Sequence, residues 1–482
     1  MTDESLCSIA VRNPRSGDVD YHVACLSADE VSSRVDDLKV HQAAWQDLGA
    51  KGRAAVLYRF AEALASESDS LSEQLAVDTG RRTFAQFEVF KSIDLVRHWA
   101  DRIESMFETL ASHGQSAQVP TVSYQHLLIP YRSVAVISPW NVPLLLALID
   151  SVAALAAGCA VILKPSEVTP RFAEPLARAI SKVPELDAVF TIVTGDADTG
   201  RAMIDQVDAV CFTGSVATGQ KVALHAAQRF IPAFLELGGK DPAIVMPSAN
   251  IPLAARAIIR SGIGMTGQAC QSLERIYCHK AVYDQLIEEL ARQLDELTMT
   301  TADDGSGDIA PLIFPPQADT IQSHVDDAVA QGARVLRGGQ IHSQGGNWYP
   351  PTLIVDVTHD MTIMREETFG PVIPVVCCDS TEQALALAND SKFGLSGAVF
   401  SQDIEEAKRI GGQLSVGAVS VNDASLTGIV NDVEKNSFQL SGMGGSRMGP
   451  AGLTRFLRKR ALLLQQAEPA SVMLFSDRND QS

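Results

Sequence analysis

From about residue 132 onward, short β-forming runs alternate with helical segments, and this alternation restricts the possible folds more than any other feature. The β-rich runs are residues 134–137, 160–163, 189–193 and 208–212. Strands that alternate with helices form right-handed βαβ units, which build a parallel sheet with helices on both faces. This part of the chain therefore predicts an α/β fold.

A second α/β stretch begins near residue 240. Its helical segments are residues 253–262, 282–298 and 381–389. Its apolar strands are residues 372–376, 398–400 and 417–421. No internal repeat or long linker separates it from the first stretch. We expect two closely packed halves with a cleft between them, where ligands commonly bind.

The first hundred residues predict mainly helices. Ser27 followed by Glu30 has the spacing of a capping box, and residues 53–66 repeat the helical pattern. Ser380 with Gln383 predicts a second capping box.

Length and charge exclude several classes of protein. A chain of 482 residues is too long for one ordinary core, so two or three packed units are expected. The net charge of −19 disfavours nucleic acid and anionic membranes as partners. The acidic N-terminus lacks a long apolar run, so we expect no signal peptide.

Residues 142–163 carry one charge, Asp150, and are long enough to span a bilayer. Pro143 opens the stretch and Gly158 interrupts it. A buried helix followed by a buried strand is the better interpretation, and no membrane span is expected.

The cysteines are sparse, and most lie in apolar runs. This pattern predicts buried, reduced thiols in a reducing compartment. Their spacing matches no zinc site, so no metal is expected. The eight positions are Cys7, Cys25, Cys159, Cys211, Cys270, Cys278, Cys377 and Cys378.

Two segments just after predicted strands have features of a dinucleotide site. In the first, Gly214, Ser215 and Gly219 lie where a strand gives way to a helix, which suits a phosphate. In the second, Lys164 and Glu167 could hold a ribose, since a carboxylate there accepts hydrogen bonds from both hydroxyls. Each segment alone also fits an ordinary turn.

Two further segments carry reactive side chains. Glu236 lies in an apolar run that leads to two glycines and Lys240, and Cys270 follows Gly267-Gln-Ala. Alone, Glu236 fits a solvent-facing strand residue and Cys270 fits inert packing.

In this order, the segments resemble the aldehyde dehydrogenase superfamily, hydrolytic and NAD(P)-dependent. The spacings also fit, with 34 residues between Glu236 and Cys270 (270 − 236) and 23 between Asn141 and Lys164 (164 − 141). The matching pieces are Pro139-Trp-Asn141, Lys164-Pro-Ser-Glu167, Phe212-Thr-Gly-Ser215 with Gly219, Glu236-Leu-Gly-Gly-Lys240, Gly267-Gln-Ala-Cys270 and Glu366-Glu-Thr-Phe369-Gly-Pro371.

The resemblance implies an enzyme that oxidises an aldehyde to a carboxylic acid. Cys270 would be the nucleophile, and the Asn141 amide and the Cys270 backbone N–H would stabilise the oxyanion. Glu236 would activate water to hydrolyse the thioester, and could also help to deprotonate Cys270. Since CoA-acylating members generally lack this glutamate, a free acid is the expected product.

The resemblance also implies the cofactor site. Glu167 favours NAD, with NADP possible, because a carboxylate repels a 2′-phosphate. The pyrophosphate would lie by Gly214, Ser215 and Gly219. The full set of expected cofactor-binding residues is Ile137, Trp140, Lys164, Ser166, Glu167, Gly214, Ser215, Gly219, Leu237, Glu367 and Phe369.

The family's architecture implies a Rossmann-like cofactor domain, an α/β catalytic domain and a small β-rich oligomerisation arm. The cofactor domain would comprise residues 1–112 and 131–238, and the catalytic domain residues 239–440. The oligomerisation arm and tail would comprise residues 113–130 and 455–482. Segments 123–130 and 460–464 are the candidate arm strands of a cytoplasmic homodimer or homotetramer.

Substrate preference is the least determined property. The family's Phe-Gly-Gly-x-Lys stretch is altered within 437–449, where a substrate entrance is expected. The resemblance places Val142, Leu146 and Ile149 along the aldehyde tunnel, although core packing explains them nearly as well. Because no arginine or lysine adjoins Cys270, we expect a neutral, apolar aldehyde, aliphatic or aromatic, with Phe438 as an aromatic wall.

Three other functions remain open: an acylating semialdehyde dehydrogenase, an enzyme for a charged semialdehyde, and a catalytically silent binding or structural member. Glu236 argues against the first, and the presence of Cys270, Glu236 and Asn141 argues against the last.

Overall fold

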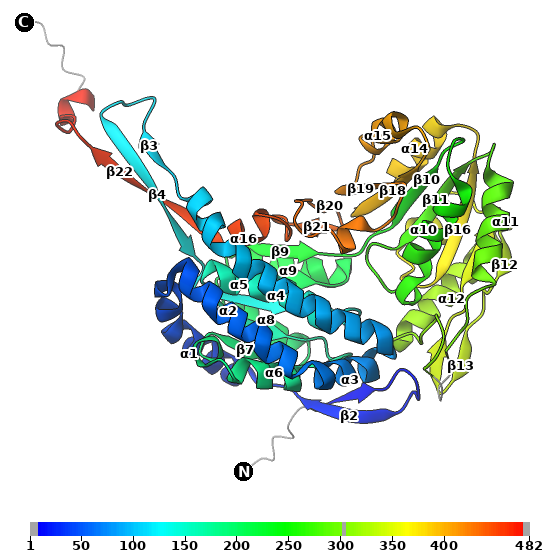
Figure 1. Ribbon diagram of the computed structural model, residues 1–482, viewed down its shortest axis with the longest axis horizontal. Helices are drawn as coiled ribbons and strands as arrows, with labels where there is room; N and C mark the ends of the chain where they lie inside the picture. The colour runs from blue at the N-terminus through cyan, green and yellow to red at the C-terminus, as the bar shows by residue number, and fades with distance from the viewer. Residues whose placement is uncertain (1–7, 301–304, 476–482) are drawn as a thin grey trace, which may run out of the picture.

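Two twisted sheets and a projecting arm form the molecule (Figure 1). The computed structural model describes residues 8–300 and 305–475, so Cys7 and the tail residues 476–482 lie outside the described residues. Among the described residues, no helix has the length and apolar character that crossing a bilayer requires.

The first sheet has six strands in the order β21-β9-β8-β5-β6-β7. All neighbours are parallel except β21, which runs antiparallel to β9. The strands are β5 (Ser133–Ile137), β6 (Ala160–Lys164), β7 (Phe190–Ile192), β8 (Ala209–Thr213), β9 (Ala233–Glu236) and β21 (Gly442–Met443).

Helices cover this sheet, which is why its central strands read as continuous apolar runs. Every residue of β6 and β8 is buried, and α1, α5, α8 and α9 pack against the sheet. These helices, with α6 and α7, are α1 (Ala28–Asp47), α5 (Pro143–Ala157), α6 (Ala173–Ser181), α7 (Pro184–Asp187), α8 (Ala197–Gln206) and α9 (Val216–Gln228). The predicted helix and strand within 142–163 are confirmed as α5 and β6.

The strand order places a binding crevice at β5. The chain runs outward from β5 through β6 to β7, and then returns to the other side of β5 as β8 and β9. In open α/β sheets, ligands bind beyond the carboxyl ends of the strands where the order reverses. Ile137, Lys164 and Thr213 end β5, β6 and β8 at this point.

The second sheet has seven strands in the order β12-β15-β16-β11-β10-β18-β19, parallel except for β12. It forms the part at the right of Figure 1. Its strands are β10 (Asp241–Val245), β11 (Leu273–His279), β12 (Arg334–Arg337), β15 (Thr352–Val355), β16 (Val372–Cys378), β18 (Ser396–Phe400) and β19 (Ala418–Val421). Its helices are α10 (Ile251–Ile263), α11 (Tyr283–Leu294), α12 (Pro315–Ala330), α13 (Thr362–Arg365), α14 (Thr381–Asn389) and α15 (Ile404–Gly411).

The predicted helical N-terminal region is present, preceded by a hairpin that the sequence analysis did not predict. The hairpin is β1 (Ser8–Arg12) with β2 (Val19–Ala24), and the further helices are α2 (Gly49–Ser66), α3 (Ser68–Thr79) and α4 (Arg82–Leu110). The Ser27 capping box is confirmed, with both reciprocal hydrogen bonds formed. At the second predicted capping box, Ser380 Oγ accepts from Gln383 N, but the reciprocal hydrogen bond does not form. The Gln383 side chain accepts from Asp379 N instead of Ser380 N.

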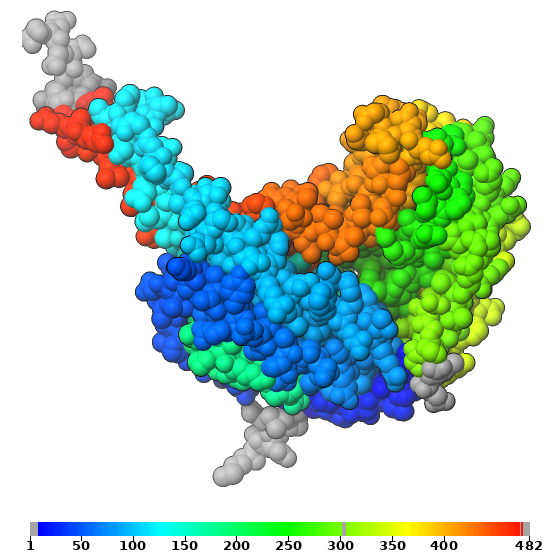
Figure 2. Space-filling view, viewed as in Figure 1, coloured from blue at the N-terminus to red at the C-terminus, as the bar shows by residue number. Residues whose placement is uncertain are grey.

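The arm consists of β3 (His113–Gln115), β4 (Val122–Pro130) and β22 (Leu457–Gln465), all antiparallel. It projects at the upper left of Figures 1 and 2. The two candidate arm strands pair directly, with Ser123 opposite Leu464 and Leu127 opposite Arg460. Leu463 on β22 is 71% exposed, so the arm presents apolar surface.

The described cysteines are free thiols, as expected, but they are not all buried. Cys377 is exposed, because it is the one outward-facing residue of the otherwise buried strand β16. Among the described residues, no group of three or more histidine, cysteine or acidic side chains could hold a metal ion.

Candidate active site

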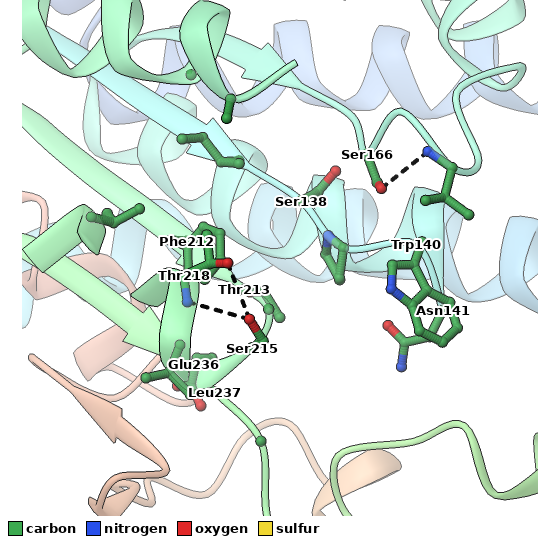
Figure 3. Close-up of a pocket in the computed structure, with 18 of the residues that line it drawn as sticks. Ser138, Trp140, Asn141, Ser166, Phe212, Thr213, Ser215, Thr218, Glu236 and Leu237 are labelled. Carbon is green, nitrogen blue, oxygen red and sulfur yellow. Dashed lines mark hydrogen bonds between the residues drawn. The ribbon is translucent and has the colours of Figure 1, made fainter. Parts of the chain in front are cut away.

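A cleft of about 570 Å³ lies at the predicted crevice of the first sheet and is closed by residues of the second. It is lined by Cys270, Glu236 and Asn141, and also by most of the expected cofactor-binding residues. Figure 3 shows part of its lining. The expected cofactor-binding residues that line it are Ile137, Trp140, Lys164, Ser166, Glu167, Gly214, Ser215, Leu237, Glu367 and Phe369.

The turn from β8 to α9 is built to approach an anion. Ser215 caps α9: its Oγ accepts from Thr218 N at 3.3 Å and lies 3.1 Å from Thr218 Oγ1 (Figure 3). Gly219 does not line the cleft but packs under it, where an added Cβ would lie 2.5 Å from a Leu237 methyl carbon. Gly214, Ser215 and Thr218 line the cleft at the start of α9, where the helix N-terminus and its dipole favour a phosphate.

A paired cation and carboxylate lie beyond the end of β6. Lys164 Nζ is 3.2 Å from Glu167 Oε2. Ser166 Oγ, labelled in Figure 3, accepts from Val168 N at 3.2 Å. Lys164 is buried while Glu167 is about half exposed. The carboxylate is therefore free to accept hydrogen bonds from a ligand's hydroxyl groups.

Glu367 and Phe369 enter the cleft from the loop before β16. Glu367 Oε1 accepts from Gly239 N at 3.1 Å, and burial raises the pKa of Glu367 to about 8. Phe369 has a left-handed backbone (φ 50°) and packs edge-on against Trp140, with ring centroids 5.4 Å apart. A strained backbone at a bulky residue requires support from its surroundings.

That support is a buried ion pair that the sequence analysis did not identify. Glu274 accepts from Thr368 N at 2.7 Å and from Phe369 N at 2.8 Å, while Lys240 Nζ lies 2.6 Å from it. Lys240 belongs to a quoted motif, but no sequence signal pointed to Glu274. The pair fixes the loop that carries Glu367.

Cys270 lies on the loop between the 3₁₀ turn Gly264–Gly267 and β11. Gly267 has φ 67°, and a Cβ there would lie 2.1 Å from Gly370 O, so glycine is required where the two loops meet. Asn141 Nδ2 donates to Gln268 O at 3.0 Å, which holds the amide beside the Cys270 loop. The second N–H of this amide has no hydrogen bond to any residue within 8–300 or 305–475.

Glu236 ends β9 and is surrounded by residues from the chain's last fifth. Ser437 Oγ donates to Glu236 Oε2 at 2.9 Å. Lys435 Nζ lies 3.7 Å from the same oxygen, and Arg447 Nε lies 3.8 Å from Oε1. The altered segment 437–449 therefore contacts the acid directly.

No cation adjoins Cys270 along the sequence, as expected, but the fold places two cations beside Glu236 in the same cleft. Lys435 and Arg447 both act to lower the pKa of the Cys270 thiol. Their effect is smaller than that of burial, which raises the Cys270 pKa to about 11. Since 199 residues separate Glu236 from Lys435 (435 − 236), no local pattern could have revealed their ion pair.

Asp150, the one charged residue of the apolar stretch 142–163, forms ion pairs with two arginines from the C-terminal part of the chain. Its Oδ2 accepts from Arg447 Nη2 at 2.9 Å, and its Oδ1 accepts from Arg455. All three side chains are almost fully buried. The charge that seemed out of place in the sequence thus pairs with the C-terminal segment.

The four expected tunnel residues do not lie together. Leu146 lines the cleft with Cys270, whereas Ile149 lines a separate cavity of about 290 Å³ between α4 and residues 447–450. Val142 is buried and lines neither cavity. Phe438 is 44% exposed in β20 (Phe438–Gln439) and also lines neither, so its role as a wall stays a prediction.

Known proteins resemble this chain along most of its length. Residues 1–462 match the family described as "Aldehyde dehydrogenase family". The 4,4'-diapolycopene aldehyde oxidase of Methylomonas sp is 36% identical over 382 residues, covering 79% of this chain and 71% of that protein. A protein of Mycolicibacterium smegmatis named "Putative succinate-semialdehyde dehydrogenase (NADP(+))" is 32% identical over 441 residues, covering 90% of this chain and 84% of its own length.

The fold is shared with solved structures. The structure of "Putative Aldehyde Dehydrogenase PutA" from Anabaena variabilis superposes with a TM-score of 0.93 at 43% identity, covering 97% of this chain and 99% of that one.

Proposed function

Because the chain belongs to the aldehyde dehydrogenase family, we propose that it oxidises an aldehyde to the carboxylic acid with NAD, through a thiohemiacetal and then a thioester on Cys270. The observation that carries this proposal is that Cys270, Asn141 and Glu236 line the same cleft as the α9 N-terminus and the Lys164–Glu167 pair.

Attack begins at the Cys270 thiolate, which adds to the aldehyde carbon. The carbonyl oxygen becomes an oxyanion, for which the Asn141 amide and the Cys270 backbone N–H are the proposed donors. The hydrogen bond from Asn141 to Gln268 O fixes the amide before the substrate arrives. NAD held at this cleft by residues such as Glu367 and the α9 N-terminus would supply the hydride acceptor for this oxidation.

Hydrolysis of the thioester is assigned to Glu236. Its carboxylate would take a proton from water, whose oxygen attacks the acyl carbon and displaces the Cys270 sulfur. Ser437 Oγ holds one carboxylate oxygen at 2.9 Å. A glutamate at this position supports a free acid over an acyl-CoA product.

The cofactor site fits NAD in the described residues. The open N-terminus of α9 suits the pyrophosphate, with Gly219 allowing Leu237 to pack beneath it, and Glu167 suits the adenosine ribose hydroxyls. Arg201, the ion-pair partner of Asp198, also lines the cleft and is a cation that a 2′-phosphate would meet there, which supports use of NADP as well.

Replacing Glu167 by glutamine should shift the cofactor preference toward NADP. The neutral amide no longer repels a 2′-phosphate, and Lys164 loses its charge partner at 3.2 Å. We expect the NAD/NADP ratio of kcat/KM to fall about tenfold. The matched control is Glu174→Gln on α6, an exposed glutamate paired with Arg178. An unchanged ratio in Glu167→Gln would remove Glu167 from the ribose site.

For the substrate, we propose a neutral, apolar aldehyde. The buried cations around Glu236 and Asp150 already have partners: Arg447 and Arg455 share Asp150, and Lys435 faces Glu236. Leu146 adds an apolar side chain to the cleft that Cys270 lines. A charged semialdehyde is the second candidate, because Arg447 Nε is buried without a hydrogen bond in the described chain, and because of the Mycolicibacterium relative's name.

A panel of hexanal, benzaldehyde and succinate semialdehyde distinguishes these candidates. We expect NADH and free acid from NAD without CoA, with kcat/KM at least about tenfold higher for the neutral aldehydes, since one uncompensated buried carboxylate costs more than that factor. A preference for succinate semialdehyde would establish the second candidate. A product that requires CoA would establish an acylating enzyme instead.

The arm supports a homodimer or homotetramer, because β22 presents Leu463 and its neighbours to solvent. The free thiols of the described residues support a reducing, cytoplasmic setting. We assign 1–112 and 131–238 to cofactor binding, 239–440 to catalysis, and 113–130 with 455–482 to assembly.

A further inference from the structure

Arg81 is a buried arginine that contacts the backbone of Asn141, the proposed oxyanion donor. It directly precedes α4, is 6% exposed, and donates from Nη1 to Asn141 O at 3.2 Å. Its Nε and Nη2 are also buried, and they form no hydrogen bond within residues 8–300 and 305–475. A buried guanidinium with a single hydrogen bond lowers the stability of a fold, so its presence calls for a reason other than stability.

Glu88 contacts the same segment from about two turns further along the chain, on α4. Its Oε1 accepts from Leu144 N at 2.7 Å and from Leu145 N at 3.0 Å. Both N–H groups belong to the first turn of α5, whose N-cap residue Val142 forms no side-chain hydrogen bond. Glu88 therefore supplies the cap that α5 lacks locally, although 56 residues separate it from Leu144.

The charges of Arg81 and Glu88 stabilise each other. Burial raises the pKa of Glu88 to about 7, and both its backbone hydrogen bonds and the Arg81 charge oppose this rise. Burial lowers the pKa of Arg81 to about 10, and the Glu88 charge opposes this fall. Neither charged group could be removed without affecting the other.

Together, these contacts fix the chain on both sides of the Asn141 amide. Arg81 holds the Asn141 carbonyl oxygen, and Glu88 holds the start of α5 three residues later. On the other side, Asn141 Nδ2 donates to Gln268 O in the Cys270 loop. The position of the Asn141 amide relative to Cys270 therefore depends on Arg81 and Glu88.

We propose that Arg81 is a positioning residue that, together with Glu88, holds Asn141 where its amide meets the oxyanion. This inference rests on the proposed role of Asn141. Neither Arg81 nor Glu88 lines the cleft, so both act through Asn141 and not on the substrate. A displacement of about 1 Å at a reacting centre costs about 10²-fold in rate, so the loss of one of the two supports should cost about tenfold.

A double-mutant cycle between Arg81 and Asn141 tests this coupling. Stopped-flow absorbance measures the rate of the first NADH formed per active site, at saturating NAD, with the most rapidly oxidised aldehyde of the panel. Arg81→Met should lower this rate about tenfold, and Asn141→Ala about 10²–10³-fold. In the Asn141→Ala background, Arg81→Met should lower it less than about twofold, because no amide is left to position.

Three further measurements separate positioning from a general loss of structure. NAD affinity and the alkylation of Cys270 by iodoacetamide, in which the thiolate displaces iodide, involve no oxyanion and should keep their wild-type values in Arg81→Met. Arg81→Lys returns a charged donor and should recover most of the rate. Arg97→Met is the matched control, since Arg97 is exposed on the same helix, and its rate should not change.

Hydrogen–deuterium exchange of the peptide 139–148 examines the same segment without aldehyde, and it should be faster in Arg81→Met than in wild type. Arg81→Gln is measured in parallel should the methionine variant unfold. Unchanged exchange, or an equal loss of rate in both backgrounds of the cycle, would overturn the proposal. Asn141→Ala at the wild-type rate would defeat the oxyanion role of Asn141 and this inference with it. Faster exchange in a protein that oxidises no aldehyde would defeat only the proposed function.

Discussion

Replacement of Cys270 by alanine is expected to lower aldehyde-dependent NADH formation by at least about 10⁴-fold, because no covalent adduct can form without the sulfur. The side chain lines the cleft with Asn141 and Glu236, and Gly267 and Asn141 hold its loop in place. Cofactor affinity should change little, since the proposed ribose and phosphate contacts come from β6 and α9. Steady-state NADH absorbance and NAD titration by calorimetry measure the two properties.

The matched control is Cys377→Ala, which removes an exposed thiol on β16 and should retain full activity. Residual turnover above about 1% in Cys270→Ala, with unchanged product, would show that another group starts the reaction. Loss of NAD binding in the same variant would instead point to collapse of the cleft.

Local patterns predicted the parts of the site that are encoded within a few residues. The start of a helix near Gly214 and Gly219, and the apolar strands at 160–163 and 208–212, could be read from short windows because helix starts and buried strands have local signals. The family motifs then assigned roles to these positions. The N-terminal hairpin was missed, although Asn13-Pro and Gly17 between two short apolar runs are turn signals that could have predicted it.

The electrostatics of the site could not be predicted in this way. Arg447 and Arg455 lie 297 and 305 residues from Asp150, and their pairing depends on how the C-terminal segment joins the edge of the first sheet, where β21 pairs with β9. The same segment brings Lys435 and Ser437 to Glu236. Contacts between residues so far apart in sequence leave no local pattern. The preference for a neutral aldehyde was inferred only from the sequence neighbours of Cys270, and so it did not take the charges of Lys435 and Arg447 into account.

The division of the tunnel residues has a similar cause. Val142, Leu146 and Ile149 share a helix face by spacing, but the Leu146 side chain reaches the cleft while Ile149 turns toward a cavity beside α4. Spacing predicts which side chains share a face, and the neighbouring elements decide which cavity each one meets.

Replacement of Glu236 by glutamine should separate hydride transfer from hydrolysis. Without a general base, we expect steady-state turnover to fall about 10²–10⁴-fold. A rapid burst of about one NADH per active site should remain, because formation of the thioester needs Cys270 rather than Glu236. Stopped-flow absorbance measures the burst, and Glu185→Gln, which removes an exposed glutamate paired with Arg59, is the control.

Hydroxylamine provides the decisive comparison for this variant. Its nitrogen attacks the thioester without needing a general base, and it releases the acyl hydroxamate and the Cys270 thiol. If Glu236 acts only in hydrolysis, hydroxylamine should restore steady NADH formation in Glu236→Gln. If the burst itself disappears and hydroxylamine restores nothing, Glu236 is required before hydride transfer, where it would help to deprotonate Cys270. Unchanged steady-state turnover would contradict both roles and leave the carboxylate, with Ser437 and Lys435, as a structural element of the cleft.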